Sequence, residues 1–172
     1  MAGARARPLP FDPVAEARGH WERAGWAEAA PGMAAVTSIM RAQQVLLARI
    51  EEVLRPHGLS FARYEVLMLL SFSRTGALPL ARLGERLQVH PASVTNLVDR
   101  LTAAGLVSRV AHPSDRRATL AELTEAGRSL ALAATADLNA TVFAAPGLTP
   151  DGVQRLVEVL TELRRDAGDF TP

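Results

Sequence analysis

The spacing of apolar residues along the chain predicts a mainly helical protein. From Met33 to Arg55, apolar side chains recur every three or four positions, which places them on one face of an amphipathic helix. Pro56 and Gly58 end this helix. Four further helices are predicted by the same spacing, each after a residue that suits a helix N-cap, over 13–30, 61–70, 125–145 and 150–163. Pro31 and Gly32 are expected to end the first of these helices.

The middle of the chain is expected to carry two shorter helices. One begins after Pro79, and the other covers 92–104, where the apolar residues Val94, Leu97, Val98 and Leu101 face inward. A break at 89–91 separates them, and Gly105 suits the left-handed residue that follows a helix. Two short helices joined by a tight turn form a helix-turn-helix.

A β-hairpin is predicted directly after these helices. Residues 106–110 and 118–123 roughly alternate between apolar and polar side chains, and the segment between them is rich in turn-forming residues. That segment also holds two adjacent arginines, Arg116 and Arg117. A hairpin in this position is a wing, so the expected fold is mainly α with a small β-hairpin wing.

Composition places the chain among globular proteins. It has 172 residues, of which 48% are apolar and 22% charged, and this length suits one compact domain over 12–172 behind a flexible arm at 1–11. No apolar run is long enough to cross a bilayer, and the first residues lack the apolar core of a signal peptide. We therefore expect a cytoplasmic protein without a membrane partner.

The sequence offers no arrangement typical of an enzyme or a metal site. There is no cysteine, which excludes disulfides, thiolate nucleophiles and thiolate zinc ligands. The four histidines are scattered without the spacing of metal ligands, His90 being a candidate helix cap. No nucleophile or pair of carboxylates has a recognisable catalytic spacing. We expect no catalytic residues, no metal and no cofactor.

The net charge of +1 hides an uneven distribution. Residues 74–118 contain seven arginines and three acidic residues, whereas 119–172 contain four arginines and eight acidic residues. A basic segment between neutral and acidic flanks is typical of a site for a polyanion, although a charge of this size also occurs on ordinary solvated surfaces.

Several short motifs in a fixed order carry a family resemblance. They are Leu83-Gly84-Glu85-Arg86-Leu87, the run from Ser93 to Leu101, Gly105-Leu106-Val107, Asp115-Arg116-Arg117 and Leu123-Thr124-Glu125-Ala126-Gly127. Over about 33–165 the chain resembles the MarR family of winged helix-turn-helix transcription regulators. The resemblance implies a DNA-binding lobe at 60–124 and a helical dimerisation lobe at 12–58 and 125–170.

The residues expected to contact double-stranded DNA lie on the second short helix and the wing. Ser93, Thr95, Asn96 and Arg100 are on the outer face of 92–104, and small polar side chains there suit a major groove. Ser93 and Thr95 could equally serve only to cap or solvate the helix. By the resemblance, Arg117 in the wing at 111–118 enters the minor groove, Arg116 contacts phosphate and Asp115 orients the arginine.

The resemblance also implies a homodimer that binds a pseudo-palindromic operator, most often as a repressor. The apolar stripes of the terminal helices fit this arrangement. They would also fit a monomer that buries both stripes internally. An alternative function is a winged-helix protein-interaction module without sequence-specific DNA binding, although such a module would not need the wing arginines.

An anionic or aromatic small molecule is the expected effector. Its candidate ligands are Trp21, Arg41, Arg63, Tyr64 and Glu65. The extra N-terminal helix with Trp21 is similar to that of the urate-type subgroup, in which Glu65 matches an aspartate. Phe72, however, stands where that subgroup has an arginine, which argues against urate itself. Trp21 and Trp26 also suit plain core positions.

Overall fold

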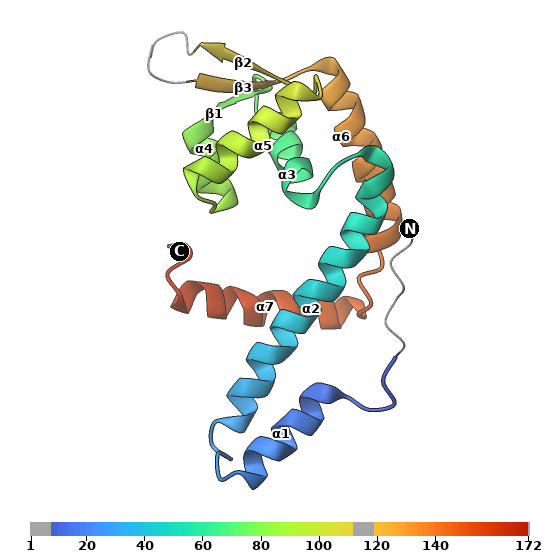
Figure 1. Ribbon diagram of the computed structural model, residues 1–172, viewed down its shortest axis with the longest axis vertical. Helices are drawn as coiled ribbons and strands as arrows, with labels where there is room; N and C mark the ends of the chain where they lie inside the picture. Colours follow the sequence, from blue (N-terminus) through green and yellow to red (C-terminus); the bar gives the residue numbers. More distant parts are fainter. Residues whose placement is uncertain (1–7, 112–118, 172) are drawn as a thin grey trace. The chain divides into compact units, whose positions relative to one another are not determined.

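The computed structural model describes residues 8–111 and 119–171. These residues form two compact units, one that ends at Arg49 and one that begins at Ile50, which are taken in turn. Figure 1 shows the helices and strands, whose bounds are α1 Pro13–Arg23, α2 Ala30–Leu54, the 3-10 helix η1 Arg55–His57, α3 Phe61–Phe72, β1 Ala77–Pro79, α4 Leu80–Leu87, α5 Pro91–Ala103, β2 Val107–Ala111, β3 Thr119–Leu123, α6 Glu125–Leu138, the π-helix η2 Asn139–Phe143 and α7 Pro150–Asp166.

The first unit contains α1 and most of α2, and it corrects the predicted end of the first helix. The helix ends at Arg23, and Gly25 follows in a left-handed conformation with φ of +88°. Pro31 and Gly32, expected to terminate this helix, lie instead in the first turn of α2. Proline is tolerated there because the first N–H groups of a helix have no partner within the helix.

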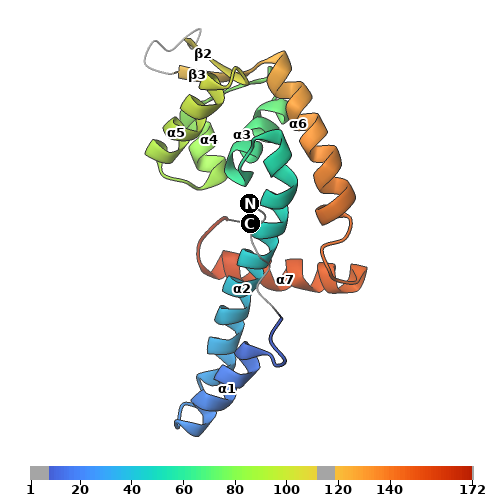
Figure 2. The same ribbon diagram turned by 45° about the vertical axis from the view of Figure 1, so that its right-hand side comes forward.

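The second unit is organised around one apolar core. Its fully buried members come from α3, α4, α5, β2, β3 and α6, and include Leu67, Leu70, Leu83, Val94, Val98, Leu101, Val107, Ala121, Ala131 and Leu138. Figures 1 and 2 both show the small sheet at one end of the group formed by α3, α4 and α5. The expected mainly helical fold with a small wing is confirmed.

The sheet has one strand more than the hairpin predicted from the sequence. β2 and β3 pair antiparallel from Val107 opposite Leu123 to Ala111 opposite Thr119. The three residues of β1 pair with the other edge of β3, which gives the order β1-β3-β2 for the described strands. A strand this short, ending in Pro79, has too few positions for alternation to reveal it.

The C-terminal helices differ from the core helices in burial. Thr124 caps α6 by accepting a hydrogen bond from the Gly127 N–H at 3.0 Å, and a single π-helical stretch extends that helix to Phe143. Thr149 caps α7 in the same way, as predicted. None of the described residues of α7 is buried, although the helix carries Val153, Leu156, Val157, Leu160 and Leu163. No helix among the described residues is long and apolar enough to cross a membrane.

Candidate nucleic-acid interface

The turn between α4 and α5 brings the two helices close together. Gln88 ends α4 in a left-handed conformation with φ of +53°, and the Val89 N–H donates to the Gly84 carbonyl oxygen at 3.2 Å. A side chain at Gly84 would lie 3.3 Å from Val94, so glycine here permits the close approach of α5. The His90 ring nitrogen accepts from the Ala92 N–H at 3.2 Å, which confirms that His90 caps α5.

Burial of one face of α5 determines which side chains reach the surface. Val94, Val98 and Leu101 are buried, and Leu97 is partly buried against them. This agrees with the four inward positions predicted from the sequence. The predicted DNA-contacting residues on this helix, Ser93, Thr95, Asn96 and Arg100, are all exposed.

Two of these polar side chains form hydrogen bonds within α5. The Thr95 hydroxyl donates to the Pro91 carbonyl oxygen at 3.2 Å. The Arg100 Nε donates to the Asn96 Oδ1 at 3.0 Å, one helical turn apart. These contacts restrict the rotamers of Thr95, Asn96 and Arg100 on the outer face of α5 before any ligand is present.

An ion pair joins α5 to the wing. An Arg109 Nη in β2 donates to the Asp99 Oδ1 at 2.7 Å. The pair connects the helix directly to the strand that leads into the wing loop. Asp115, Arg116 and Arg117, to which the sequence assigned wing roles, lie outside the described residues.

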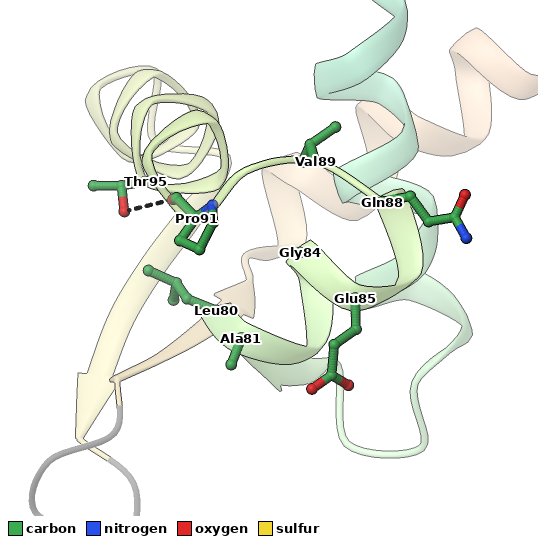
Figure 3. Close-up of a pocket in the computed structure, with 8 residues that line it drawn as sticks. All are labelled: Leu80, Ala81, Gly84, Glu85, Gln88, Val89, Pro91 and Thr95. Atoms are coloured by element: carbon green, nitrogen blue, oxygen red, sulfur yellow. Dashed lines mark hydrogen bonds between the residues drawn. The ribbon is translucent and has the colours of Figure 1, made fainter. Parts of the chain in front are cut away.

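A pocket of about 560 Å³ opens between α4 and the start of α5 (Figure 3). Its lining is mainly apolar, with Glu85 and Gln88 as the polar side chains of α4, and consists of Leu80, Ala81, Gly84, Glu85, Gln88, Val89, Pro91 and Thr95. Pro91 and Thr95 belong to the helix whose exposed face carries the predicted DNA contacts. None of the five predicted effector residues lines it.

The candidate effector residues are divided between the two units. In the first, the rings of Trp21 and Trp26 meet edge to face with centroids 5.2 Å apart, and Arg41 donates to Gln44 at 3.2 Å. Trp21 is partly buried and Arg41 exposed. In the second unit, α3 carries Arg63, Tyr64 and Glu65.

The three candidates on α3 have different surroundings. The Arg63 Nε donates to the Ser60 hydroxyl at 3.3 Å. Tyr64 is buried, and its hydroxyl lies 3.0 Å from that of Thr135 in α6. Partial burial raises the pKa of the Glu65 carboxyl above its usual value. These contacts tie Arg63 and Tyr64 into the packing of the unit.

Two side-chain contacts of α5 were not predicted from the sequence, one between Asn96 and Arg100 and one between Asp99 and Arg109. The bond between Asn96 and Arg100 follows the i, i+4 spacing of a helix and was readable in principle. The contact between Asp99 and Arg109 depends on how the hairpin folds back onto α5, which the residue pattern does not give. Within 8–111 and 119–171, no group of three or more acidic or histidine side chains is arranged to hold a metal.

Comparison with known proteins identifies relatives of this winged unit. The MarR family model matches residues 59–119. The chain is 49% identical to Sco5413, a MarR family transcriptional regulator from Streptomyces coelicolor, and the likeness covers 83% of this chain and 99% of that protein with a TM-score of 0.75.

Two more distant solved structures hold ligands. Sco3205, a MarR family regulator from Streptomyces coelicolor solved in complex with DNA, is 26% identical over 80% of this chain and 90% of its own, with a TM-score of 0.67. CouR from Rhodococcus jostii, bound to p-coumaroyl-CoA, is 28% identical over 73% of this chain and 87% of its own, with a TM-score of 0.63. Relatives of this chain thus bind DNA and small molecules.

Matches to curated proteins cover less of their length. Three Bacillus subtilis transcriptional regulators of the helix-turn-helix type are 34–36% identical, but the chain spans only 48–62% of each. One of these three is described as a repressor. The resemblance inferred from the ordered motifs is confirmed by the solved structures and the family model together.

Proposed function

The chain belongs to the MarR family of winged helix-turn-helix transcriptional regulators, which is not a family of enzymes, and from that membership we propose that it binds operator DNA as a ligand-responsive repressor. The observation that carries the proposal is the exposed polar face of α5, presented by a helix whose other face is buried. A relative solved in complex with DNA supports it.

In this proposal α5 enters the major groove and the wing at 111–118 enters the minor groove. Ser93, Thr95, Asn96 and Arg100 face base edges or phosphates from α5. On the wing, Arg117 is drawn to the negative potential of a narrow A·T-rich groove, Arg116 contacts phosphate, and Asp115 orients the arginine.

We propose that the protein acts as a homodimer on a pseudo-palindromic site. The terminal helices expose apolar side chains that one chain leaves uncovered among its described residues: Val36, Ile39, Met40 and Val45 on α2, and Leu156, Val157, Val159 and Leu163 on α7. A two-fold axis through these helices would hold two copies of α5 about one DNA turn apart.

We also propose a small anionic or aromatic effector. A relative bound to an aromatic acyl-CoA supports this class of ligand. Trp21, Arg41, Arg63, Tyr64 and Glu65 remain its candidate ligands. An effector relieves repression only if it binds the DNA-bound and the free conformations with different affinities.

Substitutions in the wing test the DNA-binding proposal. Arg116→Ala should weaken binding about equally for all sequences and lower the salt slope by roughly 0.9 per phosphate contact, or about twice that in a symmetric dimer. Arg117→Ala should weaken specific binding more than non-specific binding, most strongly at sites with A·T flanks. Fluorescence anisotropy at several salt concentrations measures both effects. Unchanged affinity and flank preference in a folded Arg117→Ala variant would instead favour a protein-interaction module.

A further inference from the structure

The contact between Asn96 and Arg100 bears on which base α5 reads. Both side chains are exposed on the outer face of α5, and the Arg100 Nε donates to the Asn96 Oδ1 at 3.0 Å. An asparagine side chain ordinarily presents one acceptor oxygen and one donor amino group. Here the arginine occupies one lone pair of that oxygen, whereas the amino group keeps both of its N–H donors for a ligand.

Neighbouring groups leave this arrangement undisturbed. Asp99, the acidic residue of α5, is held by Arg109 at 2.7 Å and does not compete for Arg100. The Thr95 hydroxyl is directed to the Pro91 carbonyl oxygen. Within the described part of the chain, neither the Asn96 amino group nor the terminal nitrogens of Arg100 donate to another residue. The pair therefore offers the groove hydrogen-bond donors.

Base edges in the major groove differ in the hydrogen-bond donors and acceptors that they present. Guanine presents two acceptors, N7 and O6, whereas adenine presents an acceptor and a donor and requires both atoms of an asparagine amide. Cytosine presents a donor. Thymine presents one acceptor, O4, beside its methyl group. Several donors side by side therefore match the two acceptors of guanine best and leave the adenine amino group without a partner.

We propose that Arg100 is a positioning residue that turns Asn96 into a reader of guanine. The inference rests on the proposed function, because it needs α5 to lie in a major groove. It assigns guanine, and not adenine, to the operator position that depends on Asn96. It also assigns the terminal nitrogens of Arg100 to the same edge or to the adjacent phosphate.

Selection from a duplex library with a randomised core tests this without a known operator. Wild-type protein should enrich guanine at one position in each half-site, and Asn96→Ala should lose that preference, which identifies the position. Arg100→Met keeps the apolar stem and removes the donor. It should release the amide and shift the preference at that position from guanine toward adenine, by about tenfold in relative affinity.

Two further variants separate orientation from charge. Arg86→Met removes one positive charge from the exposed side of α4 and should weaken binding without changing the preferred base. Arg100→Lys keeps the charge and one donor, so it should retain more of the guanine preference than Arg100→Met does.

The outcomes are distinguishable. A base other than guanine at the Asn96-dependent position in the wild type, the absence of any position that depends on Asn96, or guanine unchanged in Arg100→Met would overturn the positioning role while leaving DNA binding intact. Failure of the wild type to enrich any sequence, together with no salt-dependent retention of duplex DNA, would overturn the proposed function itself.

Discussion

Helices α5 and α7 have the same kind of apolar periodicity and opposite surroundings. In α5, Val94, Val98 and Leu101 are no more than 1% exposed. In α7, Leu156, Val157 and Leu163 are 43–58% exposed. A periodic apolar stripe therefore predicts a helix and an apolar face, but it does not specify whether that face is covered by the same chain. The described chain covers the apolar face of α5 and leaves that of α7 exposed.

The largest difference should appear when leucines are truncated. Leu101→Ala removes a fully buried side chain from α5 and should lower the free energy of unfolding by about 2–5 kcal/mol, because it leaves a cavity in the core. Leu132→Ala is the matched control, since Leu132 is also a helical leucine but is 58% exposed. Its effect should stay within about 0.5 kcal/mol. Urea denaturation followed by circular dichroism compares them, and equal effects would contradict the described core.

A glycine in the same unit gives the next largest expected effect. A Cβ at Gly127, in the first turn of α6, would overlap the Leu106 carbonyl oxygen and approach Leu123 to 2.9 Å. Gly127→Ala should therefore destabilise the fold by about 1–3 kcal/mol. Gly32→Ala is the control, because a Cβ there meets no atom within 4 Å and alanine favours a helix. Thermal unfolding of both variants checks this, and a Gly127→Ala protein as stable as the parent would exclude the close contact.

Much of the second unit could be predicted because local signals and burial agree. Ser60, Thr124 and Thr149 each accept the backbone N–H predicted by their place before a helix. Gly105 adopts the predicted left-handed conformation with φ of +71°. The predicted inward residues of α5 are the ones that the core buries.

The parts that could not be predicted depend on contacts between segments. The strand β1 exists because Leu78 and its neighbours pair with β3, more than forty residues later in the sequence. The end of α1 was misplaced because Pro31 is equally suited to follow one helix or to begin the next. At the candidate interface, the ion pair between Asp99 in α5 and Arg109 in β2 depends on how the hairpin folds back onto the helix, which the residue pattern does not give.

The contrast between α5 and α7 also predicts which substitutions should weaken the proposed dimer. The double substitution Leu156→Gln and Leu163→Gln should raise the dimer dissociation constant at least tenfold, about 1.4 kcal/mol, while the winged unit stays folded. Glu158→Gln with Glu162→Gln is the control on the same helix. Sedimentation velocity over a range of concentrations measures the change. A wild-type protein that sediments as a monomer of 18.4 kDa at micromolar concentration would exclude a dimer interface on α7.

The smallest expected effect concerns a carboxyl group inside the well-packed unit. Burial raises the pKa of Glu65 on α3, so between its usual and its raised pKa the folded chain binds more protons than the unfolded chain. The free energy of unfolding should therefore fall as pH rises through that interval, and the penalty should be absent at more acidic pH. Glu65→Gln, which does not titrate, should be slightly more stable than the parent at neutral pH.

Urea unfolding of the parent and of Glu65→Gln between about pH 4 and about pH 8 measures this difference. The advantage of Glu65→Gln should grow with pH and then level off once the parent carboxyl is ionised in both states. Glu51→Gln, at an exposed position of α2, controls for the loss of one negative charge. A constant difference across the pH range would show that the substitution acts through packing, whereas a Glu65→Gln variant less stable at neutral pH would mean that the ionised carboxylate has a favourable partner in the folded protein.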